Sequence, residues 1–347
     1  LIPHRVKHTP IQAHQLEKGS IRITQYQSDN LIVPLIKDVL ESPLAGTTGI
    51  LTKTNEDAVF IACLLQEQGM PVRLVQTNSG NFYLGDLDEI RYFNRALDLS
   101  QDTHLIDDER WETAKRCLKR EFGHAQSWEI CRNIILNFEQ VYSRKYHSDW
   151  TNYLFESKLE DFYPVQGEAI VVSTIHKAKG KEFDNVFLLL TNIESLSDEK
   201  KREVYVAITR AKQNLSIHTN GHYLSNIANG LAEYRINSNT YPAPQSLCYT
   251  LTHRDLWLDF FIDSHCQAAI NTLKSGMSLR LTEKGCTDFS NNEILRFSKK
   301  FKDILNELIQ KDYKLEKASV NFVVYWEKQE DKKEAKIVLP KVVFKKV

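Results

Sequence analysis

The sequence lacks the features that would place it in several special classes of protein. Its six cysteines are scattered without a C-x-x-C pair, which favours free thiols in a reducing compartment over a disulfide framework or a zinc site. Apolar runs are too short for a membrane span, and the N-terminal residues lack the apolar core of a signal peptide. We therefore predict a cytoplasmic protein with no membrane partner and no metal site of its own.

A net charge is also lacking. Lys+Arg and Asp+Glu each total 45, so any surface that binds a polyanion has to be local. The 347 residues are enough for two or three domains, and 42% hydrophobic with 26% charged residues is typical of a globular protein. The chain starts at Leu1 and not at methionine, and we interpret it as a piece of a larger protein.

Strand and helix patterns alternate at the start of the chain. Strands are predicted at residues 21–26, 49–52 and 72–75. Between the first two strands, residues 31–40 have apolar side chains at helical spacing. A second helix is predicted between Asn55, as its N-cap, and Gly69, which ends it. This alternation predicts an α/β layer built on a parallel sheet.

The pattern changes between about residues 78 and 164, where strand signals vanish and we predict a helical insertion. Within it, "LGDLDE" allows two interpretations: an acid pair of the Walker B type that binds magnesium, or a capping box formed by Asp86 and Glu89. The capping box is favoured because apolar residues follow at helical spacing. These residues are Leu87, Ile90, Phe93 and Leu97.

The α/β pattern resumes with "STIHKAKGKEFDNVFLLL" (residues 173–190), a polar turn between two strand-forming runs. In a parallel sheet, ligands bind where strands end and polar turns begin. Thr174 and His176 would place a hydroxyl and an imidazole at that edge. In the same turn, Gly180 would let a ligand approach the backbone, and Glu182 offers a carboxylate suited to a sugar hydroxyl. A surface carboxylate and a structural histidine are the simpler alternatives.

A second stretch, "EVYVAITRAK" (residues 203–212), contains Arg210, which is a candidate ligand-binding residue. We predict a helix over about residues 198–212 that packs Tyr205, Ile208 and Ala211 on the sheet. Arg210 would then project away from that face, toward whatever the sheet edge binds. A guanidinium held rigidly on a helix suits the charge that spreads over a transferring phosphoryl group, whereas the alternative is a surface ion pair.

A third composition begins at about residue 247 and predicts a small α/β (α+β) domain that closes with a β-hairpin. From residue 296 to 347, fourteen Lys/Arg stand against eight Asp/Glu. The lysines interleave with Phe297, Phe301, Tyr313 and Phe344. This composition fits a surface that holds a nucleic-acid backbone while rings stack on bases, and it fits an ordinary solvated face equally well. The rings of "NFVVYW" are assigned to the core.

Together these stretches resemble a known family. "TIHKAKGKEFDNVFLL" and "EVYVAITRAK" resemble motifs V and VI of the UvrD/Rep family of superfamily 1 helicases, and "ILTKTNEDAVFIACLLQEQGMPVRLV" resembles the segment before that family's 2B insertion. The resemblance covers roughly residues 1–76 and 165–220. It implies a RecA-like second motor domain over 1–76 and 165–240, a reduced 2B-like helical insertion over 77–164, and an accessory domain over 247–347.

The resemblance also implies roles for individual residues. Arg210 would contact the γ-phosphate of ATP, Glu182 the ribose, and Gly180 would belong to the same ATP site. The residues implied to face single-stranded DNA are Asn55, Thr174 and His176. The implied cofactor is ATP with Mg²⁺, in an enzyme completed by a first RecA-like domain located upstream or in a separate subunit.

Two motor elements are missing from the sequence. The Walker A pattern G-x-x-x-x-G-K-[ST] is absent, and no acid pair on a strand replaces Walker B, so the Mg²⁺ ligands are expected outside this chain. We therefore interpret the chain as the C-terminal portion of an ATP-dependent DNA helicase or translocase that is inactive as an ATPase by itself. Translocation from 3′ to 5′ follows from the resemblance alone. The alternative hypothesis is a non-catalytic, degenerate helicase domain that serves as a DNA-binding or scaffold subunit.

Overall fold

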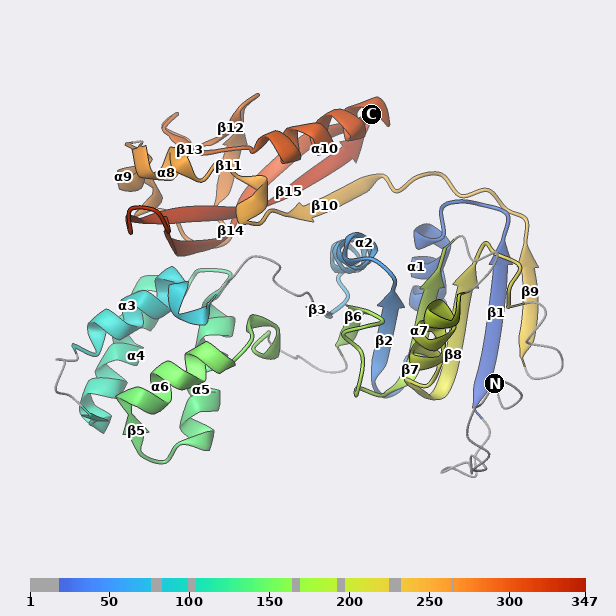
Figure 1. Ribbon diagram of the computed structural model, residues 1–347, viewed down its shortest axis with the longest axis horizontal. Helices are drawn as coiled ribbons and strands as arrows, with labels where there is room; N and C mark the ends of the chain where they lie inside the picture. Colours follow the sequence, from blue (N-terminus) through green and yellow to red (C-terminus); the bar gives the residue numbers. More distant parts are fainter. Residues whose placement is uncertain are drawn as a thin grey trace.

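The computed structural model describes residues 19–75, 83–98, 104–163, 169–191, 197–224, 232–263 and 265–347. Within these residues the chain forms a seven-stranded sheet, a six-stranded sheet and a group of helices, which Figure 1 shows as three neighbouring bodies. The predicted fold class, a parallel α/β sheet with a helical insertion and a smaller C-terminal unit, is confirmed. No helix in the described part of the chain has both the length and the apolar character needed to cross a bilayer.

The seven-stranded sheet is parallel at every pairing and has the order β3-β6-β2-β7-β8-β1-β9. Strands from both sides of the helical insertion interleave in it, so the two parts of the sequence build one layer. The strands are β1 (Ser20–Tyr26), β2 (Thr48–Thr52), β3 (Val72–Val75), β6 (Ile170–Thr174), β7 (Phe183–Leu190), β8 (Ala211–Thr219) and β9 (Glu233–Asn237).

Each face of the parallel sheet has its own core. Helices α1 (Ile32–Glu41) and α2 (Asn55–Glu67) cover one face, where they pack on β7 through Phe187 and Leu189. Helix α7 (Asp198–Ile208) covers the other face together with the connection between β6 and β7. Because side chains alternate along a strand, every second residue of β7 faces the opposite core, which explains its continuous apolar sequence.

Helix α7 is shorter than predicted. It ends at Ile208, and β8 already begins at Ala211, whose Cα pairs with Phe183 of β7. Val204 and Ala207 are the buried residues of this helix, whereas Tyr205 keeps 41% of its surface exposed. The placement of Arg210 on the helix is therefore wrong, and so is the packing of Tyr205, whereas Ile208 and Ala211 do pack, partly buried, against the core of this face. Pairing with β7 overrides the helical propensity of the Ala-Lys sequence.

The start of α2 also differs from the prediction. Thr54 is the N-cap, because its hydroxyl accepts a hydrogen bond of 3.1 Å from the amide of Asp57. Asn55 is the first helical residue, and its side chain is therefore not used as a cap. Gly69 lies just after the helix with a φ of +76°, the left-handed conformation expected where a glycine ends a helix.

The helical group contains α3 (Asp88–Ala96), α4 (Asp108–Phe122), α5 (Trp128–Val141) and α6 (His147–Glu156). A two-residue ladder between β4 (Leu105–Ile106) and β5 (Lys145–Tyr146) ties their connections together. Large rings fill the centre, where Trp111 and Trp150 meet edge to face at 5.3 Å between ring centroids. The prediction of a helical segment is confirmed, with this short ladder as an addition.

The predicted capping box at the start of α3 is absent. Leu87 is the N-cap and no side chain caps the helix. Glu89 is only 2% exposed and accepts a hydrogen bond from the hydroxyl of Ser127, the residue before α5. Asp86 instead pairs with Arg91 at 3.4 Å. The predicted apolar face of this helix is buried as expected, and that packing turns Glu89 inward. Burial raises the pKa of Glu89.

The C-terminal unit is an antiparallel sheet of order β10-β15-β14-β11-β12-β13. Its centre is the long hairpin of β14 (Tyr313–Glu327) and β15 (Glu334–Lys346), which confirms the predicted hairpin. The other elements are β10 (Ser246–Thr250), β11 (Ser278–Leu281), β12 (Gly285–Thr287), β13 (Glu293–Arg296), α8 (Asp259–Asp263), α9 (Cys266–Ile270) and α10 (Lys299–Gln310).

The aromatic residues proposed to stack on bases lie inside this unit. Phe297, Phe301, Tyr313 and Phe344 are all buried. The stacking interpretation is wrong for these four rings, because they belong to a buried hydrophobic core. Of the rings in "NFVVYW", Phe322 is buried and Trp326 packs partly buried against the core, as assigned. Tyr325 is the exception, because its partly exposed ring contacts Arg91 and Lys336.

Candidate functional site

The connection from β6 to β7 separates the predicted site residues into two clusters. Both strands pair in parallel with β2, so the connection has to run from the carboxyl end of one strand to the amino end of the other. Thr174 pairs with Thr52 of β2, and Leu188 of β7 pairs with Leu51, the residue before Thr52. Thr174 is therefore level with the carboxyl end of β7. At about 3.3 Å per residue, Thr174 and Glu182 therefore lie about 20 Å apart along the strands.

This separation corrects one expectation. The sequence suggested that a single polar turn at one sheet edge holds four of the site residues: Thr174, His176, Gly180 and Glu182. The structure instead shows a short helical turn in which the amides of Lys177 and Ala178 bond to the carbonyl of Thr174. Ile175 and Ala178 are buried against the sheet, so the connection crosses the sheet face and does not loop back. Apolar residues within the polar motif make this crossing possible.

The first group, here called the carboxyl-edge cluster, comprises Asn55, Thr174, His176 and Lys177. The amide of Ile175 bonds to the carbonyl of Thr52 at 2.9 Å, which joins the loops that follow β6 and β2. Lys177 donates from Nζ to Oδ1 of Asn55 at 2.9 Å. Sequence reasoning missed Lys177, although its place within "IHKAKGKEF" was a usable signal.

Within the carboxyl-edge cluster, exposure differs strongly among the members. The His176 side chain is 79% exposed, and its Nε2 lies 3.3 Å from Oε1 of Glu203 on α7. Asn55 is also exposed, whereas Thr174 is buried and contributes its carbonyl to the turn. An exposed amide, imidazole and ammonium can together contact the phosphate backbone of a nucleic acid. No sequence signal pointed to Glu203.

The second group, the amino-edge cluster, comprises Gly180, Glu182 and Arg210. Gly180 has a φ of +83°, and no atom lies within 4 Å of the position that a Cβ would occupy. A glycine is therefore required for its backbone conformation and not by crowding. Glu182 is exposed and directly precedes β7. The amide of Phe183 bonds to the carbonyl of Arg210 at 2.8 Å, which joins this segment to the turn after α7.

The Arg210 side chain is fixed by neutral acceptors. Its Nε donates to the carbonyl of Val206 at 2.9 Å and its Nη1 to the carbonyl of Lys181 at 3.1 Å. Its Nη2 donates to the hydroxyl of Thr209 at 3.1 Å. A guanidinium has a further N–H on each terminal nitrogen. Within the described residues no carboxylate forms an ion pair with Arg210, so its positive charge is held in place without being neutralised.

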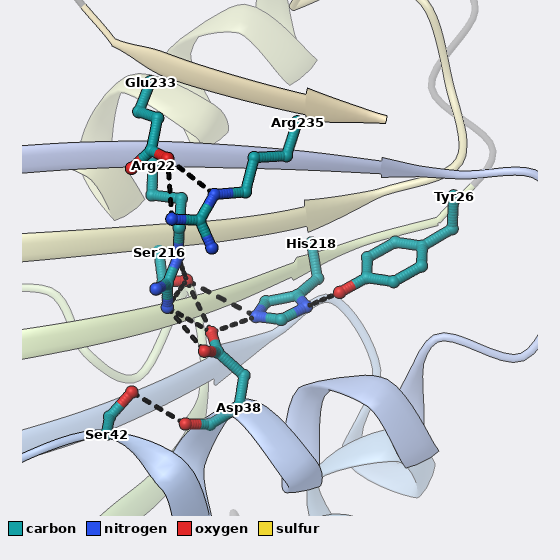
Figure 2. A network of polar contacts seen from close by, with 8 residues as sticks. All are labelled: Arg22, Tyr26, Asp38, Ser42, Ser216, His218, Glu233 and Arg235. Atoms are coloured by element: carbon teal, nitrogen blue, oxygen red, sulfur yellow. Dashed lines mark hydrogen bonds and ion pairs between the residues drawn. The ribbon is translucent and has the colours of Figure 1, made fainter. Parts of the chain in front are cut away.

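A third polar group lies between α1 and the sheet, and sequence reasoning missed it entirely. The Asp38 carboxylate accepts hydrogen bonds from Arg22 Nη2 at 2.5 and 2.6 Å and from the Ser216 hydroxyl at 2.8 Å. His218 Nε2 lies 3.0 Å from the same carboxylate, and its Nδ1 lies 2.8 Å from the Tyr26 hydroxyl (Figure 2). The partners come from distant strands, so no local sequence pattern marks them.

The protonation states of this Asp38 network follow from its geometry. Burial raises the pKa of Asp38, but hydrogen bonds from His218 and Ser216 and the charge of Arg22 outweigh it, and the pKa falls to about 2. Burial lowers the pKa of His218 and raises that of Tyr26. A neutral His218 can therefore donate to Asp38 and accept from the Tyr26 hydroxyl. Every group has a partner, which indicates a structural role.

Comparison with known proteins places both motif stretches in one family. The sequence model of the UvrD-like helicase C-terminal domain matches residues 134–222, about a quarter of the chain. The match runs from α5 through β8 and contains every predicted site residue except Asn55. Among the curated proteins, none matches the chain. The described residues contain no group of three His, Cys, Asp or Glu side chains arranged for a metal ion. Residues 134–222 are thus similar to the C-terminal domain of UvrD-like helicases.

Proposed function

We propose that the chain is the C-terminal portion of an ATP-dependent DNA helicase or translocase located in the cytoplasm. In this proposal the amino-edge cluster supplies one wall of the ATP site, and the carboxyl-edge cluster supplies part of the track for single-stranded DNA. The observation that carries the proposal is the uncompensated charge of Arg210, held rigidly inside the segment that matches the helicase family.

The amino-edge cluster has the groups that an ATP wall requires. Arg210 keeps an N–H on each terminal nitrogen, and a fixed guanidinium stabilises the charge that develops on phosphoryl oxygens. Arg210 donates a hydrogen bond to the carbonyl of Lys181, and the next residue is the exposed Glu182. The carboxylate of Glu182 can accept hydrogen bonds from ribose hydroxyls. ATP with Mg²⁺ would be completed by a first RecA-like domain, which brings the phosphate-binding loop and the Mg²⁺ ligands.

The carboxyl-edge cluster suits a different ligand. Lys177 and His176 provide positive or donating groups at the surface, and Asn55 provides an amide at the first turn of α2. Such side chains contact phosphates and sugars and give an affinity that falls as salt rises. Buried Thr174 would act indirectly, because its carbonyl fixes the turn that presents His176 and Lys177.

The assignment of Arg210 is tested in the complete enzyme, with the first RecA-like domain present. Arg210→Ala should lower the rate of DNA-stimulated ATP hydrolysis by about 10³-fold or more, because the lost charge acts mainly in the transition state. Affinity for single-stranded DNA should stay unchanged. Arg202→Ala is the matched control, since Arg202 is an exposed arginine of α7.

Two outcomes would decide against the motor proposal. Normal hydrolysis by a folded Arg210→Ala enzyme would remove the ATP role of the amino-edge cluster. A native protein without any upstream motor domain, which bound single-stranded DNA but never hydrolysed ATP, would favour the non-catalytic DNA-binding or scaffold subunit instead. The isolated chain itself should show no ATPase activity above background, with or without DNA.

A further inference from the structure

A cavity lies where the parallel sheet, the helical group and the C-terminal unit meet. Figure 1 shows β10 of the C-terminal unit running beside helix α2 of the parallel-sheet unit. The cavity is at this junction and has a volume of about 170 Å³. Leu74 of β3, Gln126 between α4 and α5, and Asn321 of β14 are among the residues that line it. A molecule bound there would therefore contact all three bodies.

The inner wall of the cavity is apolar. Ala62 of α2, Leu251 and Leu339 line it, and all three are buried. Phe322, which is also buried, adds an aromatic ring to the same wall. A cavity of about 150 Å³ with aliphatic and aromatic walls is large enough to bind benzene. This cavity therefore has room for an apolar body of about the size of one six-membered ring.

The charged side chains of the cavity are of one sign. Among the described residues that line it, Lys341 of β15 is the one lysine or arginine, and neither aspartate nor glutamate occurs. Nζ of Lys341 lies 3.4 Å from Oε1 of Gln66, which is another lining residue. Within the described part of the chain, no carboxylate forms an ion pair with this ammonium. The cavity thus offers a positive charge that the protein itself does not neutralise.

Neutral hydrogen-bonding groups accompany the ammonium. Gln66 and Gln126 are exposed, so their amides lie on the solvent side of the cavity, where a ligand can enter. His253 and Asn321 are half-buried lining residues. Burial lowers the pKa of His253, so its imidazole is neutral at neutral pH. Amides and a neutral imidazole can donate hydrogen bonds to an anionic ligand without adding charge.

We propose that this cavity is a binding site for a small organic carboxylate with an apolar body, such as a monocyclic aromatic acid. The carboxylate would pair with Lys341, and the ring would lie against Ala62, Leu251 and Phe322. An inorganic anion would leave the apolar wall without a partner, and a neutral ring would leave the ammonium without one. A mostly apolar wall with a few polar groups that fix orientation is typical of small-molecule sites.

Such a ligand would hold the three bodies in their observed arrangement. A molecule that binds the folded protein and not the unfolded chain stabilises the fold by mass action. The unfolding temperature should therefore rise when the site is saturated. This inference does not rest on the ATP or DNA roles proposed above, and its test requires neither nucleotide nor nucleic acid.

The test is isothermal titration calorimetry of the full chain with benzoate as the probe. Acetate, which lacks the ring, and benzamide, which lacks the charge, are the matched ligands. Benzoate is expected to bind, and each of the other two should bind at least about tenfold more weakly, because each loses one of the two interactions. Saturating benzoate should also raise the unfolding temperature in a thermal melt.

Two substitutions address the two parts of the site separately. Lys341→Met should weaken benzoate binding by about tenfold and leave benzamide binding unchanged. Ala62→Leu, which fills the cavity, should abolish the binding of both. Lys345→Met is the matched control, because Lys345 lies on the same strand, pairs with Glu316 at 3.7 Å and does not line the cavity.

The proposal is overturned if benzoate does not bind, or if a folded Lys341→Met protein binds it as tightly as the wild type. Equal affinity for benzoate and benzamide would show that the ammonium recognises no charge. Equal affinity for benzoate and acetate would show that the apolar wall contributes nothing, and either result also overturns the proposal. Should a variant not fold, the three ligands still decide the question on the wild-type protein.

Discussion

Two arginines of the parallel-sheet unit show how the same side chain serves different purposes. Arg22 lies against the carboxylate of Asp38, inside a network in which every group has a partner. Arg210 is held by two carbonyls and a hydroxyl, and no carboxylate among the described residues neutralises it. A charge that is fully compensated within the fold contributes to stability, whereas a fixed and uncompensated charge is available to a ligand. The predictions below test this contrast.

The largest effect on stability is expected from breaking the compensated pair. Asp38→Ala leaves Arg22 and His218 without their acceptor, and breaking a largely buried charge pair costs about 3 kcal/mol. Chemical denaturation should show this loss in the free energy of unfolding. Glu41→Ala is the matched control on the same helix, because the exposed Lys37–Glu41 pair at 3.8 Å should contribute less than about 0.5 kcal/mol. Equal effects of the two substitutions would contradict the structural role.

The second prediction concerns pH. Burial lowers the pKa of His218, so the unfolded chain binds more protons below pH 6.5, and the free energy of unfolding falls as the pH falls. One such group contributes at most about 1.4 kcal/mol per pH unit. Asp38, with a pKa of about 2, adds a second loss as the pH falls from about 4 to 2. Denaturation curves of His218→Gln should show a smaller slope between pH 6.5 and 5, and an unchanged slope would refute the assignment.

The third prediction concerns the uncompensated side of the contrast. If Glu182 accepts a hydrogen bond from ribose, Glu182→Gln in the complete enzyme should raise the KM for ATP about fivefold, which corresponds to roughly 1 kcal/mol for one hydrogen bond. Steady-state kinetics with saturating single-stranded DNA measure this effect. Glu199→Gln, an exposed carboxylate at the start of α7, is the control. An unchanged KM would make Glu182 an ordinary surface residue.

The sequence was sufficient for the strand and helix rhythm because apolar spacing reports local burial directly. The sequence-based prediction failed where contacts with residues distant in the sequence determine the local structure. Arg210 was placed on a helix, but pairing of Ala211 with Phe183 ends that helix about four residues earlier than its composition suggests. Glu89 was assigned to a cap, although contact with Ser127 buries it. The aromatic residues near the C-terminus were ambiguous, since an interleaved ring and lysine pattern is the same for a core and for a stacking surface.

The candidate site was predicted in its residues but not in its arrangement. Both motif stretches stood out because polar groups interrupt buried strands. The separation into two clusters was not predicted, because it depends on β6 and β7 both pairing in parallel with β2, a contact between segments that are distant in the sequence. The Asp38 network was not predicted for a related reason. Its aspartate comes from α1 and its serine and histidine come from β8, so these residues meet only in the folded protein.

The central claim is that the connection between β6 and β7 has an ATP end and a DNA end, and one crossed measurement tests it. In the complete enzyme, ATPase rates are recorded against ATP concentration and against single-stranded DNA concentration for Glu182→Gln and Lys177→Ala. We predict that Glu182→Gln changes only the half-saturating ATP concentration. Lys177→Ala should raise only the half-saturating DNA concentration, by about fivefold, and should reduce the salt dependence by about one phosphate contact. If both substitutions shift both constants equally, the two ends are not separate sites and the account is wrong.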